Sequence, residues 1–290
     1  MKYFTNFLFV FLFVNVSFSQ NNYEYVGAIK LNDSSLITYQ IKFVEKNGEI
    51  KGYSLTDVGG LHETKSNLYG KYNAIEKFIE FKEKDIVYTK SPIVQEDFCF
   101  VNFKSSKFKL GNSKITGKFK GLFSDNTQCI NGDILLSTKE KMEKRIAKVQ
   151  KIISKTKKIP DSLKERSNIV KIMDSVNMNI LRDKQVLSVF SKSKNIRIEI
   201  FDGGKLDGDK VTLKYNGNTL LRNFETKKDR KSIPLTLVNK KNTFILTADN
   251  VGSMSTNTAV IEIFVDNSKI KALTNLNKGE QTQIDFYLKD

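Results

Sequence analysis

The stretch "FDGGKLDGDKVTLKYNGN", residues 201–218, contains the features that decide the fold of its half of the chain. Every second residue of "KVTLKY" is apolar or aromatic, which predicts a strand with one buried face. Asn216 and Gly217 follow it, and this pair favours the two-residue hairpin turn in which both central residues have positive φ. The stretch therefore predicts two antiparallel strands joined by a tight turn.

The same alternation surrounds this hairpin. It occurs in "NIRIEIF" (195–201), "NTFILTA" (242–248), "AVIEIF" (259–264) and "QIDFYL" (283–288). About seven or eight short strands at this spacing are typical of a β-sandwich. We therefore predict that residues 185–290 form an immunoglobulin-like β-sandwich.

Three carboxylates, Asp202, Asp207 and Asp209, lie beside glycines at the start of the opening stretch. Asp and Gly are the residues that a tight turn between strands uses, so a turn alone accounts for them. Calcium takes six to eight oxygen ligands, so the same three carboxylates are also candidate calcium ligands. Their spacing is not that of an EF-hand, and the sequence leaves both interpretations open.

The N-terminal half, residues 20–137, also shows strand periodicity. "TYQIKF" (38–43) and "ITGKFKGLF" (115–123) alternate, and turn signals such as "KNGE" (46–49) and "KLGNSK" (109–114) separate such runs at short intervals. This pattern predicts an antiparallel meander of about eight strands that curls into a barrel or half-barrel. The expected fold class is mainly β.

Cys99 and Cys129 are the only two cysteines in the chain. Both lie where strands of the N-terminal half are expected to end, so they can come within the short separation that a disulfide needs. The alternatives are two free thiols or a metal site, but two cysteines and the single His62 cannot supply four zinc ligands without carboxylates. We predict a disulfide.

Residues 138–184 lose the strand pattern and are expected to connect the two halves. Met142, Ile146, Val149 and Ile153 follow one another at helical spacing, Pro160 ends or kinks this helix, and a second helix is expected after it. Residues 139–184 hold 14 Lys and Arg against 6 Asp and Glu, a net charge of +8 out of +16 for the whole chain. These charges belong either to a solvated helical face or to a surface that makes peripheral contact with an anionic partner. We expect trypsin to cut first near Lys155–Lys164 and to separate two folded halves.

The first nineteen residues have the pattern of a secretory signal peptide. Lys2 precedes the apolar run "FLFVFLFVNV" (7–16), and small residues follow before Gln20. The run is too short to span a membrane as a helix. We expect cleavage after Ser19 and export to the periplasm or the extracellular space, which argues against nucleic acid as a partner.

The sequence shows no recognisable catalytic motif. His62, the only histidine, has no nearby cysteine and no Gly-x-Ser-x-Gly elbow, so we interpret it as a surface residue. Glu76, Glu80, Glu83 and Asp85 are carboxylates that a glycosidase could use, but their alternation places the glutamates on a solvated face. We therefore predict no enzymatic activity, no catalytic residues and no cofactor, with calcium at the three aspartates as the alternative to a turn.

The two segments "FDGGKLDGDKVTLKYNG" and "TADNVGSMSTNTAVIEI" together resemble the C-terminal β-sandwich of uncharacterised secreted proteins of Bacteroidota type. The matching positions are Asp202, Asp207, Gly208, Asp209, Asn216 and Gly217 in the first segment, and Ala248, Asn250, Gly252, Asn257, Thr258 and Ala259 in the second. The N-terminal half is similar to avidin and lipocalin barrels, although the Gly-x-Trp opening of lipocalins is absent. The resemblance implies a secreted two-domain β protein and no particular activity.

Two functional hypotheses follow. The first is a non-catalytic secreted or cell-envelope binding protein whose partner is a small ligand, a glycan or an envelope protein. The second is a secreted hydrolase of glycans or peptides with a carboxylate site that the sequence does not reveal. A buried apolar cavity in the barrel would favour a carrier, whereas a core filled by aromatic side chains would favour a structural module.

Overall fold

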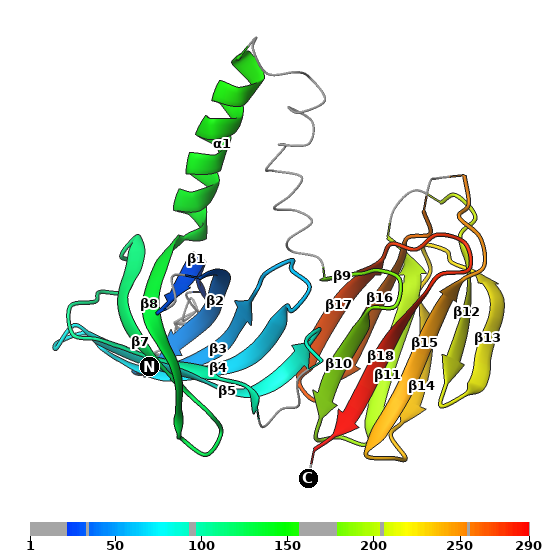
Figure 1. Ribbon diagram of the computed structural model, residues 1–290, viewed down its shortest axis with the longest axis horizontal. Helices are drawn as coiled ribbons and strands as arrows, with labels where there is room; N and C mark the ends of the chain where they lie inside the picture. Colours follow the sequence, from blue (N-terminus) through cyan, green and yellow to red (C-terminus); the bar gives the residue numbers. More distant parts are fainter. Residues whose placement is uncertain are drawn as a thin grey trace, which may run out of the picture.

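The structure is a computed structural model, and it describes residues 22–32, 35–92, 97–156, 179–203, 206–253 and 256–289. It consists of a β-barrel, a helix and a β-sandwich (Figure 1). The predicted signal peptide and the predicted second helix after Pro160 lie outside the described residues. The fold class expected from the sequence is confirmed.

The N-terminal half is a closed antiparallel barrel of eight strands. Each strand pairs with the next one in sequence, and β1 pairs with β8 to close the cylinder. The strands are β1 (Asn22–Leu31), β2 (Leu36–Lys46), β3 (Glu49–Thr56), β4 (Thr64–Asn73), β5 (Phe78–Thr89), β6 (Phe100–Ser105), β7 (Lys114–Leu122) and β8 (Gln128–Thr138). Their inward residues are those that the alternation predicts, so Ile41 and Phe43 of β2 are fully buried.

Aromatic side chains fill the centre of the barrel. Tyr25, Phe43, Phe81 and Phe103 are almost completely buried, and the rings of Phe81 and Phe103 stack with their centroids 5.0 Å apart. An eight-stranded barrel is just wide enough for its own side chains to occupy the interior. The interior of this barrel is therefore occupied by its own side chains.

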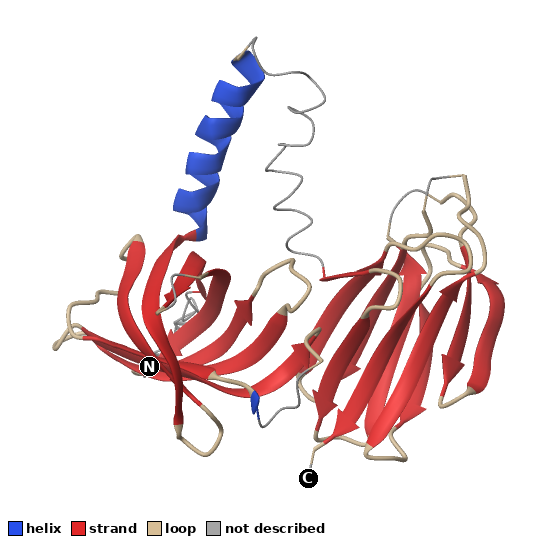
Figure 2. Ribbon diagram, in the orientation of Figure 1, coloured by secondary structure: helices blue, strands red, loops and turns tan. Residues whose placement is uncertain are grey.

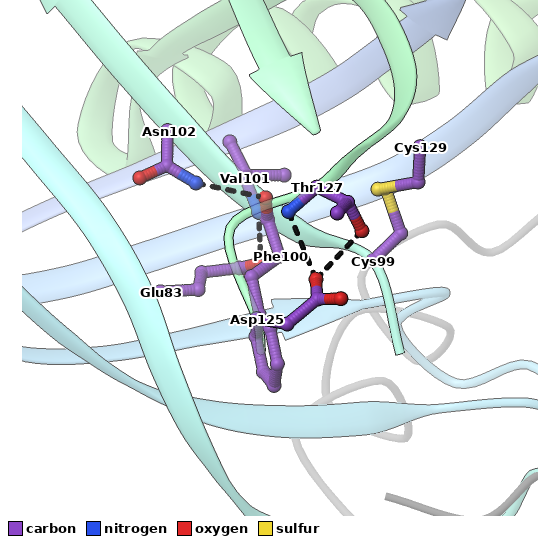
Figure 3. Close-up of a disulfide and its surroundings, with 8 residues drawn as sticks. All are labelled: Glu83, Cys99, Phe100, Val101, Asn102, Asp125, Thr127 and Cys129. Atoms are coloured by element: carbon purple, nitrogen blue, oxygen red, sulfur yellow. Dashed lines mark hydrogen bonds between the residues drawn. A yellow bond between two sulfur atoms is a disulfide. The ribbon is translucent and has the colours of Figure 1, made fainter. Parts of the chain in front are cut away.

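The predicted disulfide is confirmed. Cys99 and Cys129 are bonded, with their Cα atoms 6.0 Å apart. Cys99 precedes β6 and Cys129 lies in β8, so the bond joins two strands that are separated by β7 (Figure 3). Next to it, the Asp125 carboxylate accepts hydrogen bonds from the backbone and the hydroxyl of Thr127 and closes the turn between β7 and β8.

One helix, α1 (Lys139–Lys155), follows the barrel directly and begins where the sequence predicts it. It extends away from the barrel (Figure 1), and none of its residues is buried. Its first turn is anchored to the barrel, since the Lys139 ammonium lies 3.0 Å from a Glu24 carboxylate oxygen and the Lys141 ammonium donates to the Ser113 hydroxyl. The helix is therefore held to the barrel at one end.

The C-terminal half is a β-sandwich of ten strands. These are β9 (Asn179–Leu181), β10 (Val186–Ser191), β11 (Asn195–Asp202), β12 (Lys210–Tyr215), β13 (Asn218–Glu225), β14 (Lys231–Thr236), β15 (Lys241–Ala248), β16 (Ala259–Val265), β17 (Ser268–Thr274) and β18 (Gln281–Leu288). One face follows the order β13-β12-β15-β18-β10 and the other β14-β11-β16-β17-β9, with one apolar core between them. Asn216 and Gly217 have positive φ, as the predicted hairpin requires.

Two features of the sandwich differ from the sequence-based expectation. Its first strand, β9, begins at Asn179 rather than near Gln185, because three residues are too few to show alternation. In addition, β10 pairs with the end of β5, with Ser188 opposite Thr89. The barrel and one face of the sandwich thus belong to one continuous sheet of thirteen strands.

Strand β5 makes this junction by changing direction along its length. Ile79 and Phe81 pack in the barrel core, whereas Val87 and Tyr88 pack in the core of the sandwich. Between them Asp85 has a φ of 37°, and the pairing of β4 with β5 shifts register nearby, as at a β-bulge. The bulge allows one strand to serve both domains.

Candidate functional site

The main candidate site is a cleft between the barrel and the sandwich, with a volume of about 1130 Å³. The barrel contributes Leu61, Asp85, Lys90, Ser91 and Pro92, and the sandwich contributes Arg182, Asp183, Lys184, Gln185, Val186, Ser188, Phe190, Lys192, Lys240, Asp285, Tyr287, Leu288 and Lys289. The cleft exists because β5 and β10 meet along only a short ladder and diverge beyond it. We call it the junction cleft.

The junction cleft is basic. Six Lys and Arg against three Asp give its lining a net charge of +3. Asp285 is already engaged, since its carboxylate lies 2.9 Å from the Lys241 ammonium and accepts a hydrogen bond from Thr243. Asp183 lies 4.0 Å from the Lys184 ammonium, so the carboxylates of the lining offset part of its positive charge and a net charge of +3 remains.

Two of the lysines in the cleft are partly removed from water. Burial is the main reason that the pKa of Lys90 and the pKa of Lys289 lie below their usual values. The carboxylates of Glu63 and Asp85 oppose this shift for Lys90 and Lys289 respectively, and the cations Arg182 and Lys192 add to it. Both ammonium groups donate to backbone carbonyls, Lys90 to Ile180 and Lys289 to Ile86. A bound anion would relieve the mutual repulsion of these cations.

The cleft also has an aromatic surface. Phe190 of β10 and Tyr287 of β18 stack side by side on adjacent parallel strands, with ring centroids 5.4 Å apart. The Lys289 ammonium lies 5.4 Å from the Phe190 ring centre, and the Lys241 ammonium lies 5.8 Å from that of Tyr287. Flat apolar surface bordered by cations fits a ligand that has both a ring and a negative charge.

The described residues that line the junction cleft include neither histidine nor cysteine. Its serine hydroxyls belong to Ser91, which follows Lys90, and to Ser188, which is opposite Asp285 in the β10–β18 ladder. Its lining was not predicted from the sequence, because it comes from segments near residues 61, 90, 185, 240 and 287 that only the fold brings together.

A smaller pocket of about 390 Å³ lies at the barrel mouth and is lined in part by His62, Glu83 and Cys99. His62 is exposed, as predicted. The expectation for Glu83 is wrong: this carboxylate is buried, because Ile79, Phe81 and Glu83 occupy alternate positions of β5 and share its inner face. It accepts hydrogen bonds from the Tyr39 hydroxyl at 2.9 Å and the Val101 amide at 2.7 Å (Figure 3 shows the latter).

The three aspartates singled out in the sequence lie at one end of the sandwich. Asp202 ends β11, and Asp207 and Asp209 precede β12. Asp202 and Asp209 are 3% and 1% exposed, and burial together with the charges of Asp207 and Asp202 raises the pKa of Asp209. The charges of Asp202 and Asp207 thus act on Asp209, but no three His, Cys, Asp or Glu side chains of the described residues are placed to hold a metal ion together.

Comparison with protein-family models, with curated proteins and with solved structures found no match for this chain. Among the described helices, none has the length and apolar character needed to cross a membrane. The fold and the cleft define a two-domain β protein in which a closed barrel and a sandwich share a sheet and border a basic cleft.

Proposed function

We propose that this chain is an exported, non-catalytic binding protein that holds an anionic, ring-containing ligand, such as an acidic glycan, in the junction cleft. The observation that carries the proposal is the combination of a net charge of +3 with a stacked pair of aromatic rings in one cleft of about 1130 Å³. Clefts of this size with a few convergent polar groups are the usual binding sites of small ligands. The signal-peptide pattern and the resemblance to secreted proteins support export.

The filled barrel supports this location for the ligand. Its core side chains are almost completely buried, so a lipocalin-like carrier role has no support from the barrel interior. The cleft lies outside the barrel and takes residues from both domains. A ligand bound there would contact the two halves at once, which is the arrangement expected when a site forms at a domain interface.

Binding can be tested with a uronic-acid oligosaccharide and a neutral oligosaccharide of the same length, using titration calorimetry on the purified protein. We expect the acidic sugar to bind more tightly, and its affinity to fall as salt is added. The variant Arg182→Ala/Lys192→Ala should weaken binding about 10²- to 10⁴-fold, because each of the two charged hydrogen bonds contributes about 1.5–3 kcal/mol. Tyr287→Ala should weaken the binding of both sugars.

The matched control is Lys118→Ala/Lys120→Ala, which removes two exposed charges from the outer face of β7. This variant should bind like the wild type. Equal binding by the cleft variant and the control would contradict the cleft as the site. Loss of binding only when the lysines of α1 are replaced would point instead to a peripheral anionic contact through the basic connector, and shortening of the sugar during incubation would favour the hydrolase hypothesis.

A further inference from the structure

A second site, independent of the junction cleft, lies in two loops at one end of the sandwich. The loop between β11 and β12 carries Asp207 and Asp209, and the loop between β15 and β16 carries Asn257. These loops gather at the same end of the two sheets (Figure 2). We call the three residues the loop cluster.

The loop cluster contains buried oxygen atoms that accept no hydrogen bond from the described residues. They are both carboxylate oxygens of Asp207, Oδ1 of Asp209 and Oδ1 of Asn257. Asp209 is 1% exposed and Asn257 is 0% exposed. A buried carboxylate without a partner costs several kcal/mol, so such oxygens need a proton or a cation nearby.

Hydrogen bonds fix these groups in place. The Thr258 amide donates to Asp209 Oδ2 at 2.7 Å, which leaves Oδ1 as the free oxygen of that carboxylate. The Asn257 side-chain nitrogen donates to the carbonyls of Lys210 and Asn250, so its Oδ1 is the free oxygen of the amide. In each side chain one polar atom is fixed by hydrogen bonds, and Oδ1 of Asp209 and Oδ1 of Asn257 remain available to a ligand.

A second asparagine joins the two loops. The Asn250 side chain accepts a hydrogen bond from the Lys210 amide at 2.6 Å and donates to the Gly208 carbonyl at 2.8 Å. Gly252 lies against Asp207, because a Cβ at this glycine would come within 2.8 Å of the Asp207 carboxyl carbon. The loops are therefore closed tightly around the Asp207 carboxylate.

The described lysines form no ion pair with the carboxylates of the loop cluster. The Lys228 ammonium lies 3.9 Å from Asp202 Oδ1, so Asp202 has its own counter-charge. In the described part of the chain, no Lys, Arg or His forms an ion pair with Asp207 or Asp209. Of the two local lysines, Lys210 does not approach these carboxylates as an ion pair, and Lys205 lies outside the described residues.

We propose that the loop cluster binds one calcium ion through Asp207, Asp209 and the amide oxygen of Asn257. Within the described residues, no three His, Cys, Asp or Glu side chains are placed to hold a metal by themselves, so the amide oxygen, backbone carbonyls and water complete the coordination shell. Calcium is the cation that accepts such mixed oxygen ligands in irregular geometry, whereas magnesium demands a near-ideal octahedron and zinc prefers nitrogen and sulfur. Calcium-binding modules outside cells commonly have dissociation constants of about 10⁻⁴–10⁻³ M.

The test measures the melting temperature of the full-length purified protein after treatment with a chelator. We expect the melting temperature to rise with the logarithm of the calcium concentration, by several degrees at about 10 mM, since only the folded state holds the ion. Magnesium at the same concentration should give a smaller rise. Calorimetry should show one calcium ion per chain.

Variants assign the effect to the loop cluster. Asp207→Asn/Asp209→Asn should abolish the calcium-dependent rise, and the single change Asp207→Asn should weaken calcium binding at least tenfold while disturbing the fold less. The control Glu225→Gln/Asp229→Asn removes two exposed negative charges from the neighbouring β13 end and loop, and should keep the full calcium response. This control distinguishes calcium bound at the loop cluster from a general effect of calcium on the protein's surface charge.

Two results would overturn the proposal. The first is a melting temperature that does not depend on calcium, together with a double variant that is as stable as the wild type, because this would mean that protons or turn hydrogen bonds already satisfy the aspartates. The second is a calcium response that persists in the folded Asp207→Asn variant, which would place the ion elsewhere.

Discussion

At the scale of single residues, the protein surrounds its buried carboxylates in two different ways. Glu63 and Glu83 of the barrel each accept two hydrogen bonds, from a tyrosine hydroxyl and a backbone amide. The carboxylates of Asp207 and Asp209 keep buried oxygens without donors. The first pair is satisfied by the protein alone and is structural, whereas the second pair is suited to an external cation.

Tyr39→Phe tests the structural role of Glu83. Burial raises the pKa of Glu83, and the Tyr39 hydroxyl opposes this by stabilising the ionised form. Because the folded pKa lies above the unfolded one, the contribution of Glu83 to stability is full below the unfolded pKa and is lost as pH rises through the folded pKa. Removing the hydroxyl should therefore cost about 1–3 kcal/mol at pH 7 and less near pH 4.5.

Urea unfolding at the two pH values measures this difference, with Tyr69→Phe as the control because that tyrosine is 39% exposed. An equal loss of stability at both pH values would show that Tyr39 contributes through packing rather than through Glu83.

Residue patterns also explain which parts of the site were predictable. The cluster of Asp202, Asp207 and Asp209 is visible in the sequence because its members are close along the chain. Asn257 was noted only within the resemblance, since an asparagine near a turn has no pattern that marks it as a ligand. Glu83 was misplaced because its charge was taken as a sign of a solvated face, although it alternates in phase with the buried Ile79 and Phe81.

At the scale of elements, the disulfide and β5 have complementary effects. The disulfide joins the start of β6 to β8 across the intervening β7. Gly121 of β7 lies directly beneath it, and a Cβ at this position would come within 2.4 Å of the Cys99 sulfur. The disulfide therefore cross-links the β6–β8 side of the barrel, whereas β5 links the barrel to the sandwich.

Cys129→Ser should lower the free energy of unfolding by roughly 2–5 kcal/mol, because the 30-residue separation of the cysteines becomes an unconstrained loop in the unfolded chain. Denaturant titration of the variant, and of the wild type under reducing conditions, should give similar losses. A variant as stable as the oxidised wild type would contradict a stabilising role for the bond.

Strand existence was predictable at this scale, but strand partners were not. Alternation predicted the strands of both halves, and the Asn-Gly pair predicted the β12–β13 hairpin. Alternation shows which face of a strand is buried and contains no information about a partner far along the chain. The pairing of β5 with β10 was therefore not predicted.

At the scale of the whole molecule, the two halves form one unit. They share hydrogen bonds between β5 and β10, and Tyr88 of the barrel strand packs in the core of the sandwich. The expectation that cleavage of the connector separates two independent halves did not include this shared sheet. The junction cleft depends on the same contact, since its two walls come from the two domains.

Limited trypsin digestion tests this unity. The first cuts should fall at the lysines near the end of α1, around Lys155, because no residue of this helix is buried. After cutting, the two fragments should still elute together in size-exclusion chromatography and separate only in denaturant. Fragments that separate in native buffer would show that the β5–β10 junction is too weak to hold the halves together, and first cuts within the barrel would contradict the exposed helix.

The pairing of β10 with β5 also affects folding during synthesis, because the chain is made from its N-terminus and β5 is made before β10. The barrel strands are complete once β8 has been synthesised, but the end of β5 then presents unpaired backbone groups and the side chains of Val87 and Tyr88 to its surroundings. β10, which covers this edge, is itself paired with β18. A nascent chain therefore exposes the edge until β10 and β18 have been made, and truncation before Gln281 would remove the strand that supports β10.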